Sequence, residues 1–345
     1  MKVLFLTSGA KTPSSRFRVH QYVPFLEKVG IKCLVAPLIP NKYYGSRIRG
    51  MAPLLSAMKV GKRVYDIFRS LEADVIFLER DLLPLSSIWP ERLLFRLNSN
   101  IIFDFDDAIF LKYKDKIDWI IRKSKVVITG NDYLAAYANQ YNRLVLTIPT
   151  SVDLEKYKSK DHQNTSEVPV IGWVGTSSNL CYLAALRKPL AELSNRYNFL
   201  FDVVSDDPQK ACQILGDISG LRLTTKKWSE TSEINDLLNF DIGVMPLRDA
   251  EWEKGKCALK LIQYMALGIP SVASPVGENA KIISNGENGF LASSDIEWKE
   301  KLERLLNAPE LRLRFGVEGR KLVEQNYSIQ ANFPSFLKAL EYACE

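Results

Sequence analysis

The stretch Asp241–Leu291 constrains the fold of this chain more than any other. It opens with an apolar run, which predicts a buried strand. After a polar loop, apolar residues recur with helical spacing between Ala258 and Ala266, and Gly268 stands where a helix needs a left-handed residue to end. A second short apolar strand follows at Ser271–Ser274. This order predicts a βαβ unit, whose loop and helix N-terminus at the carboxyl end of the first strand can bind phosphate.

Short apolar strands separated by helical patterns recur through the rest of the chain, which predicts two doubly wound parallel sheets of the α/β class. The polar stretch Lys158–Glu167 is the predicted linker, and the tail Ser328–Cys344 is a predicted helix. The first-half strands are Lys2–Ser8, Ile31–Ala36, Asp74–Leu78, Ile101–Phe105 and Lys125–Thr129, and the second-half strands are Val168–Val174, Phe199–Ser205, Leu221–Thr224, Asp241–Met245 and Ser271–Ser274.

Composition sets the broad class. At 345 residues, with 46% hydrophobic and 25% charged residues, the chain suits a soluble protein of two domains. Its five cysteines are scattered and form no C-x-x-C pair, which favours free thiols in a reducing cytoplasm over disulfides or structural zinc. The two histidines make a histidine-based metal site improbable, and no apolar run is long enough for a signal peptide or a membrane span.

Charge is distributed unevenly. Residues 1–150 contain 23 Lys and Arg against 13 Asp and Glu, a net charge of +10, and the remaining residues carry −4 of the overall +6. Opposite signs suggest two domains with different surfaces, although chance variation in solvated charge is an alternative. Within the basic half, Lys42–Arg69 combines basic and apolar residues in a pattern that suits an anionic membrane surface. The alternative is that this stretch packs its apolar face on the sheet.

The run Gln263–Leu291 (QYMALGIPSVASPVGENAKIISNGENGFL) resembles the nucleotide-sugar signature of GT-B glycosyltransferases, specifically the retaining family 4. The resemblance implies two Rossmann-like doubly wound domains facing a cleft. It implies an acceptor domain at residues 1–160, a nucleotide-sugar domain at 161–327 and a C-terminal helix, 328–345, that returns to the first domain. An ordinary βαβ unit is the alternative interpretation.

The family pattern has two glutamates eight residues apart, and here these places hold Gly255 and Gln263. Gln263 can still bond a ribose hydroxyl, whereas Gly255 has no side chain. Lys256, Glu253 or Lys260 must therefore help to hold the donor. By resemblance, the donor-binding residues in this segment are Lys256, Cys257, Ala258, Lys260 and Gln263.

A second donor-binding segment is Val170–Asn179, where an apolar strand runs into Gly175 and the hydroxyl residues Thr176, Ser177 and Ser178. Hydroxyls and backbone amides at such a turn are good donors to a diphosphate. The alternative is a plain cap of the predicted helix Leu180–Leu193. Trp228 could stack on the base, or it could belong to the core.

Three carboxylates, Asp104, Asp106 and Asp107, stand close together after a predicted strand, where their mutual repulsion requires a function such as binding a metal or a hydroxyl. By resemblance, Asp106 and Asp107 take the places of a His-Asp pair that faces the donor sugar, so they are the predicted catalytic residues. The alternatives are a metal-binding D-x-D pair formed by Asp104 and Asp106, or carboxylates that only cap a loop.

The loop after the first strand contains Gly9, Arg16 and Arg18 but no G-x-G-x-x-G fingerprint. By resemblance this loop lies over the diphosphate and near the acceptor, and its arginines suit an anion. A solvated helix start is the alternative. Arg80, after another strand, is a fainter candidate of the same kind.

The resemblance, taken together with these residues, implies a metal-independent retaining glycosyltransferase that needs no cofactor and uses a nucleoside diphosphate sugar as substrate. The predicted role is cell-surface glycan or glycolipid synthesis in the cytoplasm, on an unknown acceptor that is either soluble or lipid-linked and presented at the inner membrane face. The alternatives are a nucleotide-sugar epimerase of the same fold and a metal-dependent transferase using Asp104 and Asp106. A nucleic-acid-binding function is disfavoured because no recognition motif is present.

Overall fold

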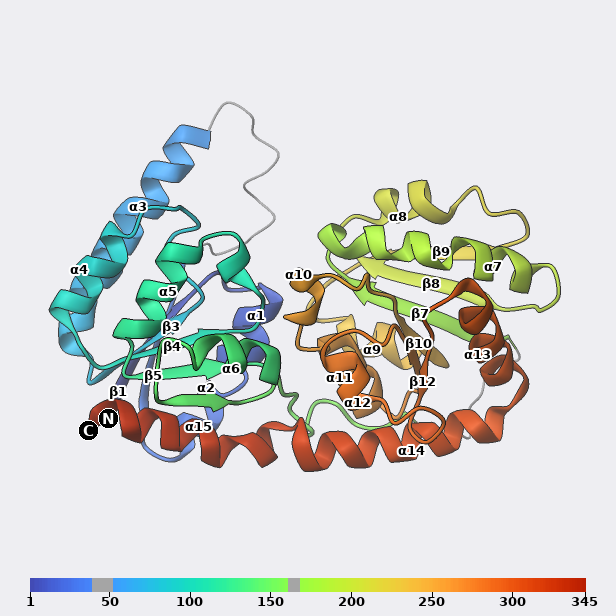
Figure 1. The fold of residues 1–345 in the computed structure, drawn as a ribbon. Helices are drawn as coiled ribbons and strands as arrows, with labels where there is room; N and C mark the ends of the chain where they lie inside the picture. Colours follow the sequence, from blue (N-terminus) through green and yellow to red (C-terminus); the bar gives the residue numbers. More distant parts are fainter. Residues whose placement is uncertain (39–51, 161–167) are drawn as a thin grey trace. The chain divides into compact units, whose positions relative to one another are not determined.

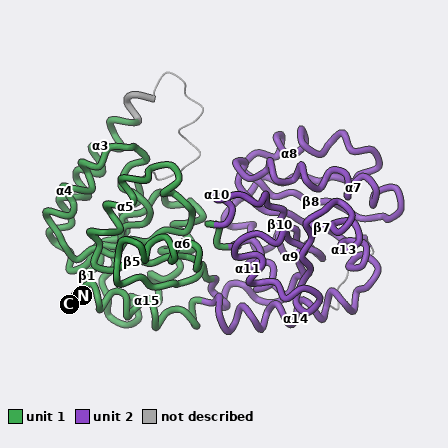
Figure 2. Tube along the Cα trace, viewed as in Figure 1, with its two compact units in different colours: residues 1–151, 255–257, 329–345 green, residues 152–254, 258–328 purple. Residues whose placement is uncertain are grey.

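The computed structural model describes residues 1–38, 52–160 and 168–345, without the side chains of residues 52–55. The chain forms two compact units (Figure 2). Unit 1 comprises Met1–Ser151, Gly255–Cys257 and Ile329–Glu345, and unit 2 comprises Val152–Lys254 and Ala258–Ser328. Two segments distant in sequence therefore complete unit 1: three residues before a helix of unit 2, and the C-terminal helix.

Unit 1 is built on a six-stranded sheet in the order β2-β1-β3-β4-β5-β6, in which all the neighbouring strands are parallel (Figure 1). Strands β3, β4 and β5 are buried along their whole length, as expected for a parallel sheet with helices on both faces. The strands are β1 (Lys2–Thr7), β2 (Lys32–Pro37), β3 (Val75–Glu79), β4 (Ile101–Phe105), β5 (Val126–Thr129) and β6 (Val145–Thr147).

One face of this sheet is covered by α2 and α15. Tyr22, just before α2, stacks on Phe336 of α15 with ring centroids 4.4 Å apart, and Phe336 also stacks on Phe77 of β3 at 5.3 Å. The C-terminal helix thus belongs to the core of unit 1. The helical segments of unit 1 are α1 (Pro13–Ser15), the π-helical turn η1 (Arg16–His20), α2 (Val23–Lys28), α3 (Ala52–Arg69), η2 (Ser70–Glu72), α4 (Trp89–Leu97), η3 (Ile109–Leu111), α5 (Lys114–Lys123), α6 (Asp132–Ala138) and α15 (Ile329–Cys344).

Unit 2 has a second six-stranded parallel sheet in the order β12-β11-β10-β7-β8-β9. Counted from its first strand, this is the strand order 3-2-1-4-5-6 of dinucleotide-binding sheets. The strands are β7 (Val170–Gly175), β8 (Leu200–Ser205), β9 (Arg222–Lys227), β10 (Ile242–Met245), β11 (Ser271–Ala273) and β12 (Phe290–Leu291).

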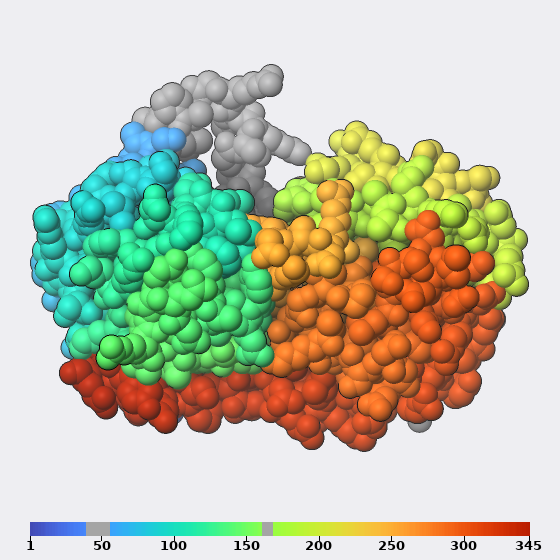
Figure 3. All heavy atoms as spheres, in the orientation of Figure 1, coloured from blue at the N-terminus to red at the C-terminus, as the bar shows by residue number. Residues whose placement is uncertain are grey.

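The helices of unit 2 enclose a separate core around Trp173, Phe201 and Phe315. Helices α13 and α14 form part of the surface of this unit, orange to red in Figure 3. The helical segments are η4 (Ser177–Leu186), α7 (Arg187–Ser194), α8 (Pro208–Leu215), α9 (Glu233–Leu238), α10 (Glu251–Lys254), α11 (Leu259–Ala266), α12 (Glu278–Ile282), α13 (Asp295–Asn307) and α14 (Pro309–Asn326).

The predicted fold class is confirmed, because both halves are α/β units with parallel sheets. One predicted helix differs in detail. The helix predicted over Leu180–Leu193 starts earlier, as the 3₁₀ segment η4, and continues as α7. Residues 42–51 of the predicted amphipathic stretch lie outside the described residues. No helix in the described part of the chain is long and apolar enough to cross a membrane.

Candidate active site

The strand order of unit 2 places a ligand-binding position between β7 and β10. The connections from these two adjacent strands run in opposite directions across the sheet, and in open α/β sheets ligands bind at the carboxyl ends of such strands. The loop after β7 begins at Gly175, and the loop after β10 leads through α10 to α11. Both segments predicted to bind the donor therefore lie beside this position between β7 and β10, which we call the switch point.

Lys260 is the cation placed at this switch point. Its ammonium lies 5.3 Å from the ring centroid of Trp173 in β7, and its stem lies against Gly175. A Cβ at position 175 would stand 2.9 Å from Lys260 Cε and 2.6 Å from Trp173 Cη2. Glycine is therefore required there to let the lysine of α11 reach the end of β7.

The turn after Gly175 is held by an acid that the sequence analysis missed. Asp206, just after β8, accepts hydrogen bonds from the backbone N–H and the hydroxyl of Ser177, at 2.5 and 2.9 Å. The hydroxyls of Thr176 and Ser178 bond each other at 2.9 Å. Ser177 thus serves the turn itself, and Thr176 and Ser178 are better placed than Ser177 to donate to a ligand.

The start of α11 has a strained backbone. Ala258 is its N-cap and has φ 50° and ψ 29°, a left-handed conformation that a residue with a side chain seldom adopts. Among the described residues, only Arg80 and Ala258 are non-glycine residues with positive φ. Such strain persists where the surrounding structure enforces it, and it clusters at functional sites. Both strained residues are among the predicted site residues.

Gln263 lies where the family pattern has its second glutamate, but the structure does not place it as a ribose ligand. Its side chain is only 2% exposed, and its amide nitrogen donates to the hydroxyl of Tyr157 at 2.9 Å. The predicted role for this amide therefore has to be corrected to an internal one, because α11 turns this position into the core of unit 2.

Gly255 occupies the place of the first glutamate, and packing explains why it has no side chain. The segment Gly255–Cys257 belongs to unit 1, where a Cβ on Gly255 would stand 2.7 Å from both the backbone nitrogen and the Cβ of Ala108. The nearest buried acid in sequence is Glu253, which accepts a hydrogen bond from the hydroxyl of Tyr182 at 2.5 Å.

The neighbouring residues of this segment are also anchored in unit 1. The Cys257 thiol donates to the backbone oxygen of Asp106 at 3.2 Å, and the amide nitrogen of Asn131 donates to the backbone oxygen of Lys256 at 3.2 Å. Gly130 leaves room for the sulfur, since a Cβ there would stand 2.2 Å from it. Cys257 and the Lys256 backbone are therefore packed against the ends of β4 and β5.

Trp228, the residue predicted to stack on a base, follows β9 and is partly buried. Its backbone N–H donates to Ser205 at the end of β8, and its ring N–H donates to Glu233 at 2.9 Å. The indole is thus fixed at the carboxyl end of the sheet of unit 2.

In unit 1, Arg80 joins the two acids predicted to be catalytic. Its Nε and Nη2 donate to Asp106 Oδ1 at 2.9 and 2.7 Å, and Nη2 also donates to Asp107 Oδ2 at 2.5 Å. The side chains of Arg80, Asp106 and Asp107 are 22, 14 and 19% exposed, so solvent reaches the cluster. Burial favours the protonated form of Asp106, but Arg80 and Arg18 together lower its pKa below the usual value.

Arg18 is buried and does not lie on the surface. It forms a buried ion pair with Asp104, and its Nη1 donates to the backbone oxygen of Ile148 at 2.6 Å. The prediction that Arg18 binds an external anion is therefore corrected, because η1 directs its guanidinium inward. Burial raises the pKa of Asp104 to about 6, although Arg18 acts in the opposite direction.

These two arginines also bear on the D-x-D metal alternative. Arg18 donates to both carboxylate oxygens of Asp104 and Arg80 donates to one oxygen of Asp106, so a cation shared by the two carboxylates would compete with these arginines. Within the described residues, no cluster of three or more His, Cys, Asp or Glu side chains is arranged to hold a metal ion.

The loop after β1 is organised by Glu79, a second residue that the sequence analysis missed. This buried carboxylate accepts from the Ser8 backbone at 2.9 Å, from the Ser8 hydroxyl at 3.2 Å and from the Ser15 hydroxyl at 2.5 Å. The Gly9 N–H donates to Ser15 at 3.3 Å. Arg16 is partly exposed, with its guanidinium 5.1 Å from the centre of the Phe17 ring.

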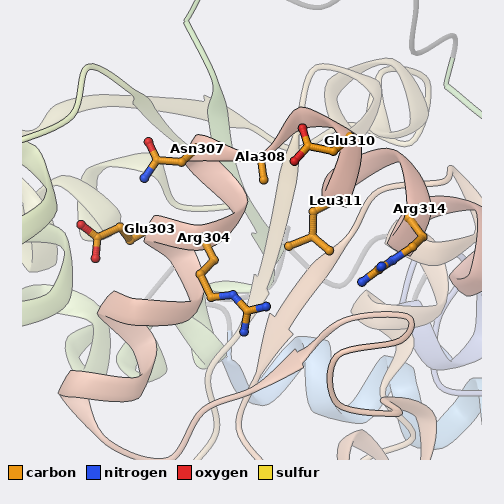
Figure 4. A pocket seen from close by; sticks show the side chains of 7 residues that line it. All are labelled: Glu303, Arg304, Asn307, Ala308, Glu310, Leu311 and Arg314. Carbon is orange, nitrogen blue, oxygen red and sulfur yellow. The ribbon is translucent and has the colours of Figure 1, made fainter.

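A hollow of about 770 Å³ lies away from these loops, at the junction of α13 and α14. Figure 4 shows that its side chains come from two successive helices. They are Glu303, Arg304, Asn307, Ala308, Glu310, Leu311 and Arg314. None of these residues follows a strand at the carboxyl edge of the sheet, so the hollow is not part of the candidate site.

The comparisons with known proteins bear on the family and the fold of the chain. The model of the family described as "Glycosyl transferases group 1" matches residues 168–308. The fold resembles that of sucrose-phosphate synthase from Thermosynechococcus elongatus, with a TM-score of 0.74, 14% identity and coverage of 100% of this chain and 99% of that one. No curated protein matches the chain at a significant level.

Two other solved structures are similarly close. A glycosyltransferase from Rickettsia africae has a TM-score of 0.71 and 15% identity, covering 100% of this chain and 98% of that one. Anabaena HepE, solved with UDP and glucose, has a TM-score of 0.71 and 14% identity, covering 99% of both chains. These proteins are GT-B glycosyltransferases. Residues 168–308 therefore match the model of the group 1 glycosyltransferases, and the chain as a whole has the GT-B fold of these solved structures.

Proposed function

We propose that the protein transfers a sugar from a nucleoside diphosphate sugar to an acceptor hydroxyl with retention of configuration at the anomeric carbon. The observation that carries this proposal is Lys260 at the β7–β10 switch point, beside a glycine turn, within the group 1 glycosyltransferase domain. The similar protein HepE was solved with UDP-glucose, which supports a donor of this chemical class.

Lys260 and the turn after Gly175 would hold the diphosphate. As the bond between the anomeric carbon and the diphosphate oxygen breaks, negative charge develops on the leaving group, and a fixed cation stabilises it more than it stabilises the intact donor. A new bond forms from the acceptor oxygen on the same face of the sugar. The proton of the acceptor hydroxyl passes to the leaving phosphate, so no side chain has to act as nucleophile.

Asp106 and Asp107 would serve the sugar end of the donor. Arg80 holds both carboxylates on one side, and their remaining lone pairs can accept hydrogen bonds from sugar hydroxyls. We assign these two residues a catalytic role because they are partly accessible, whereas Asp104 is fully buried beneath them.

The reaction is proposed to need neither cofactor nor metal, since Lys260 supplies the positive charge at the diphosphate. Treatment with EDTA should therefore leave turnover largely intact. Loss of nucleotide binding on chelation would favour the metal-dependent alternative. Conversion of the donor alone, without an acceptor, into a second nucleotide sugar would favour the epimerase.

A screen of nucleoside diphosphate sugars tests the proposal. We expect one donor to raise the thermal unfolding temperature and to be slowly hydrolysed, with the released sugar first formed in the donor's own anomeric configuration. Product of inverted configuration would exclude the retaining mechanism. If no nucleotide sugar binds, the assignment of the donor class is wrong.

The acceptor is proposed to be a cell-surface glycan or glycolipid precursor, linked to lipid and presented at the cytoplasmic face of the inner membrane. The excess positive charge of residues 1–150 supports this proposal, because basic residues outnumber acidic ones there even after the ion pairs within unit 1 are counted. Arg18 and Arg63 are buried among internal partners, whereas most of the other basic residues described in unit 1 are solvent-accessible.

A further inference from the structure

Helix α3 exposes apolar side chains that the fold of unit 1 does not use. Met58, Tyr65, Phe68 and Leu71, which we call the outer stripe, are 62, 64, 54 and 61% exposed. Met58, Tyr65 and Phe68 are separated by seven and three residues, so they share one side of the helix, and Leu71 lies in the turn that follows.

The opposite side of α3 is already fully engaged with the sheet. Arg63 is completely buried and donates to the backbone oxygens of Thr7, Ala36 and Leu82 at 2.6, 2.9 and 2.9 Å. These acceptors lie at or after the carboxyl ends of β1, β2 and β3. Arg63 and the buried Ile67 therefore hold the helix on the sheet, and the residues of the outer stripe do not contribute to this packing.

The position of Arg63 corrects the sequence interpretation of Lys42–Arg69. Internal packing describes the side of α3 that carries Arg63, and contact with a membrane stays a prediction for the exposed side. Arg63 belongs to the buried side, so it cannot contact a membrane.

Charge distinguishes the possible partners of the outer stripe. Lys59, Lys62 and Arg69 are partly exposed on α3. The only acid of the helix, Asp66, is buried and forms ion pairs with Lys62, Arg63 and Arg69 at 2.6, 3.3 and 3.6 Å. The exposed acid next to the stripe, Glu72, is paired with Lys2 at 3.0 Å. An apolar stripe bordered by cations complements a surface with apolar depth and negative headgroups.

We infer that the outer stripe and its bordering lysines dock the protein on an anionic phospholipid surface, with α3 lying in the plane of the headgroups. Phe68 and Leu71 would enter the apolar boundary, Tyr65 would lie at headgroup level, and Lys59 would contact lipid phosphates. The inference extends the proposed membrane location. The docking itself does not depend on the proposed function, but its role does, which is to bring the enzyme to a lipid-linked acceptor.

Co-sedimentation of the full-length protein with vesicles tests this docking. We expect binding to vesicles of phosphatidylcholine mixed with phosphatidylglycerol, weaker binding to phosphatidylcholine alone, and release by high salt. Replacing Tyr65 and Phe68 together by Ser should lower the partition coefficient at least about tenfold, because two large apolar contacts are lost. Lys59→Glu should lower it by about tenfold and reduce the dependence on salt.

A matched control is available in unit 2. Leu313 and Val317 of α14 are 45 and 43% exposed and lie four residues apart on a helix. Replacing both by Ser should leave vesicle binding unchanged. All these variants should keep the wild-type thermal unfolding temperature, because the replaced side chains are exposed.

Three outcomes would overturn the inference. The protein could stay in the supernatant with anionic vesicles at low salt, or the Tyr65/Phe68 variant could bind like the wild type. The lipid-free protein could also form a dimer that this variant abolishes, which would make a second copy the partner. Donor hydrolysis by the variants in solution separates the two proposals: a wild-type protein that binds vesicles but uses no nucleotide sugar contradicts the proposed function and leaves the docking intact.

Discussion

Lys260 is the single side chain whose removal should most affect donor binding. Its ammonium lies against Trp173 at the end of β7, and a charge-assisted contact to phosphate contributes roughly 1.5–3 kcal/mol. Lys260→Ala should therefore weaken the affinity for free nucleoside diphosphate by about ten- to a hundredfold, as measured by calorimetry. Lys254→Ala is the control, since Lys254 is paired with Glu251 at 2.9 Å and its loss should not change this affinity. An unchanged affinity in Lys260→Ala would place the diphosphate elsewhere.

Arg80 gives a prediction about pH. Because the pKa of Asp106 is lowered in the fold, its pairing with Arg80 stabilises the protein above the ordinary carboxyl pKa, and this stabilisation is lost as the pH falls through the lowered value. Arg80→Gln should reduce the unfolding free energy by about 1–3 kcal/mol at neutral pH, and the difference from wild type should shrink below about pH 4. Urea unfolding at several pH values measures this.

The same substitution should change the pH dependence of activity. Without Arg80, burial dominates and raises the pKa of Asp106, so the acidic limb of the kcat/KM profile should move to higher pH. Arg80→Lys should keep the limb near its wild-type position, because the positive charge remains. A limb that stays in place in Arg80→Gln would show that the ionisation of Asp106 does not limit the reaction.

At the residue scale, the sequence predicted which residue types gather at the site but not how they bond. Arg18 and Gln263 could be taken as ligands because a side chain's direction depends on the helix that carries it. The π-helical η1 turns Arg18 toward Asp104, and α11 turns Gln263 toward Tyr157. Asp206 was missed because it follows a neighbouring strand and carries no local motif.

At the scale of elements, the turn between β7 and η4 depends on a missing side chain. Gly175→Ala would place a methyl group 2.6 Å from the Trp173 ring and 2.9 Å from Lys260. We expect the lysine to be displaced, so that diphosphate affinity falls by about tenfold or more while the sheet remains folded. Gly61→Ala is the control, because open space surrounds that position in α3 and alanine should stabilise the helix by about 0.5–1 kcal/mol.

Elements were predictable where local chemistry decides them. Gly268 has φ 73° just after α11, as its position before Pro270 indicated, and β10 and β11 lie within their predicted runs. Element types were less predictable where the backbone departs from the α-helix. The apolar spacing over Leu180–Leu193 suggested an α-helix, but Ser177–Leu186 forms the 3₁₀ segment η4, because short-range spacing does not distinguish two helices of similar pitch.

At the scale of the whole molecule, the two sheets followed from the alternation of strands and helices, because parallel strands require crossovers. The segments that unit 1 receives from later in the chain followed from no local pattern. Gly255–Cys257 joins unit 1 through Asp106 and Asn131, contacts across more than 120 residues that only the folded chain reveals. Val152 is the first residue of unit 2 and Ser328 is the last one before the chain returns to unit 1. These two residues form an isolated parallel β-bridge.

The return of α15 predicts that unit 1 depends on the last residues of the chain. Phe336 is 2% exposed and stacks on both Tyr22 and Phe77, so Phe336→Ala should lower the unfolding free energy by about 3–5 kcal/mol. Diphosphate binding by unit 2 should be unchanged below the unfolding temperature, because the core of unit 2 contains no residue of α15. Val317→Ala in α14 is the control and should change stability by less than about 0.5 kcal/mol. Calorimetry with and without nucleoside diphosphate measures both quantities, and equal loss of binding and stability would show that the two units fold as one.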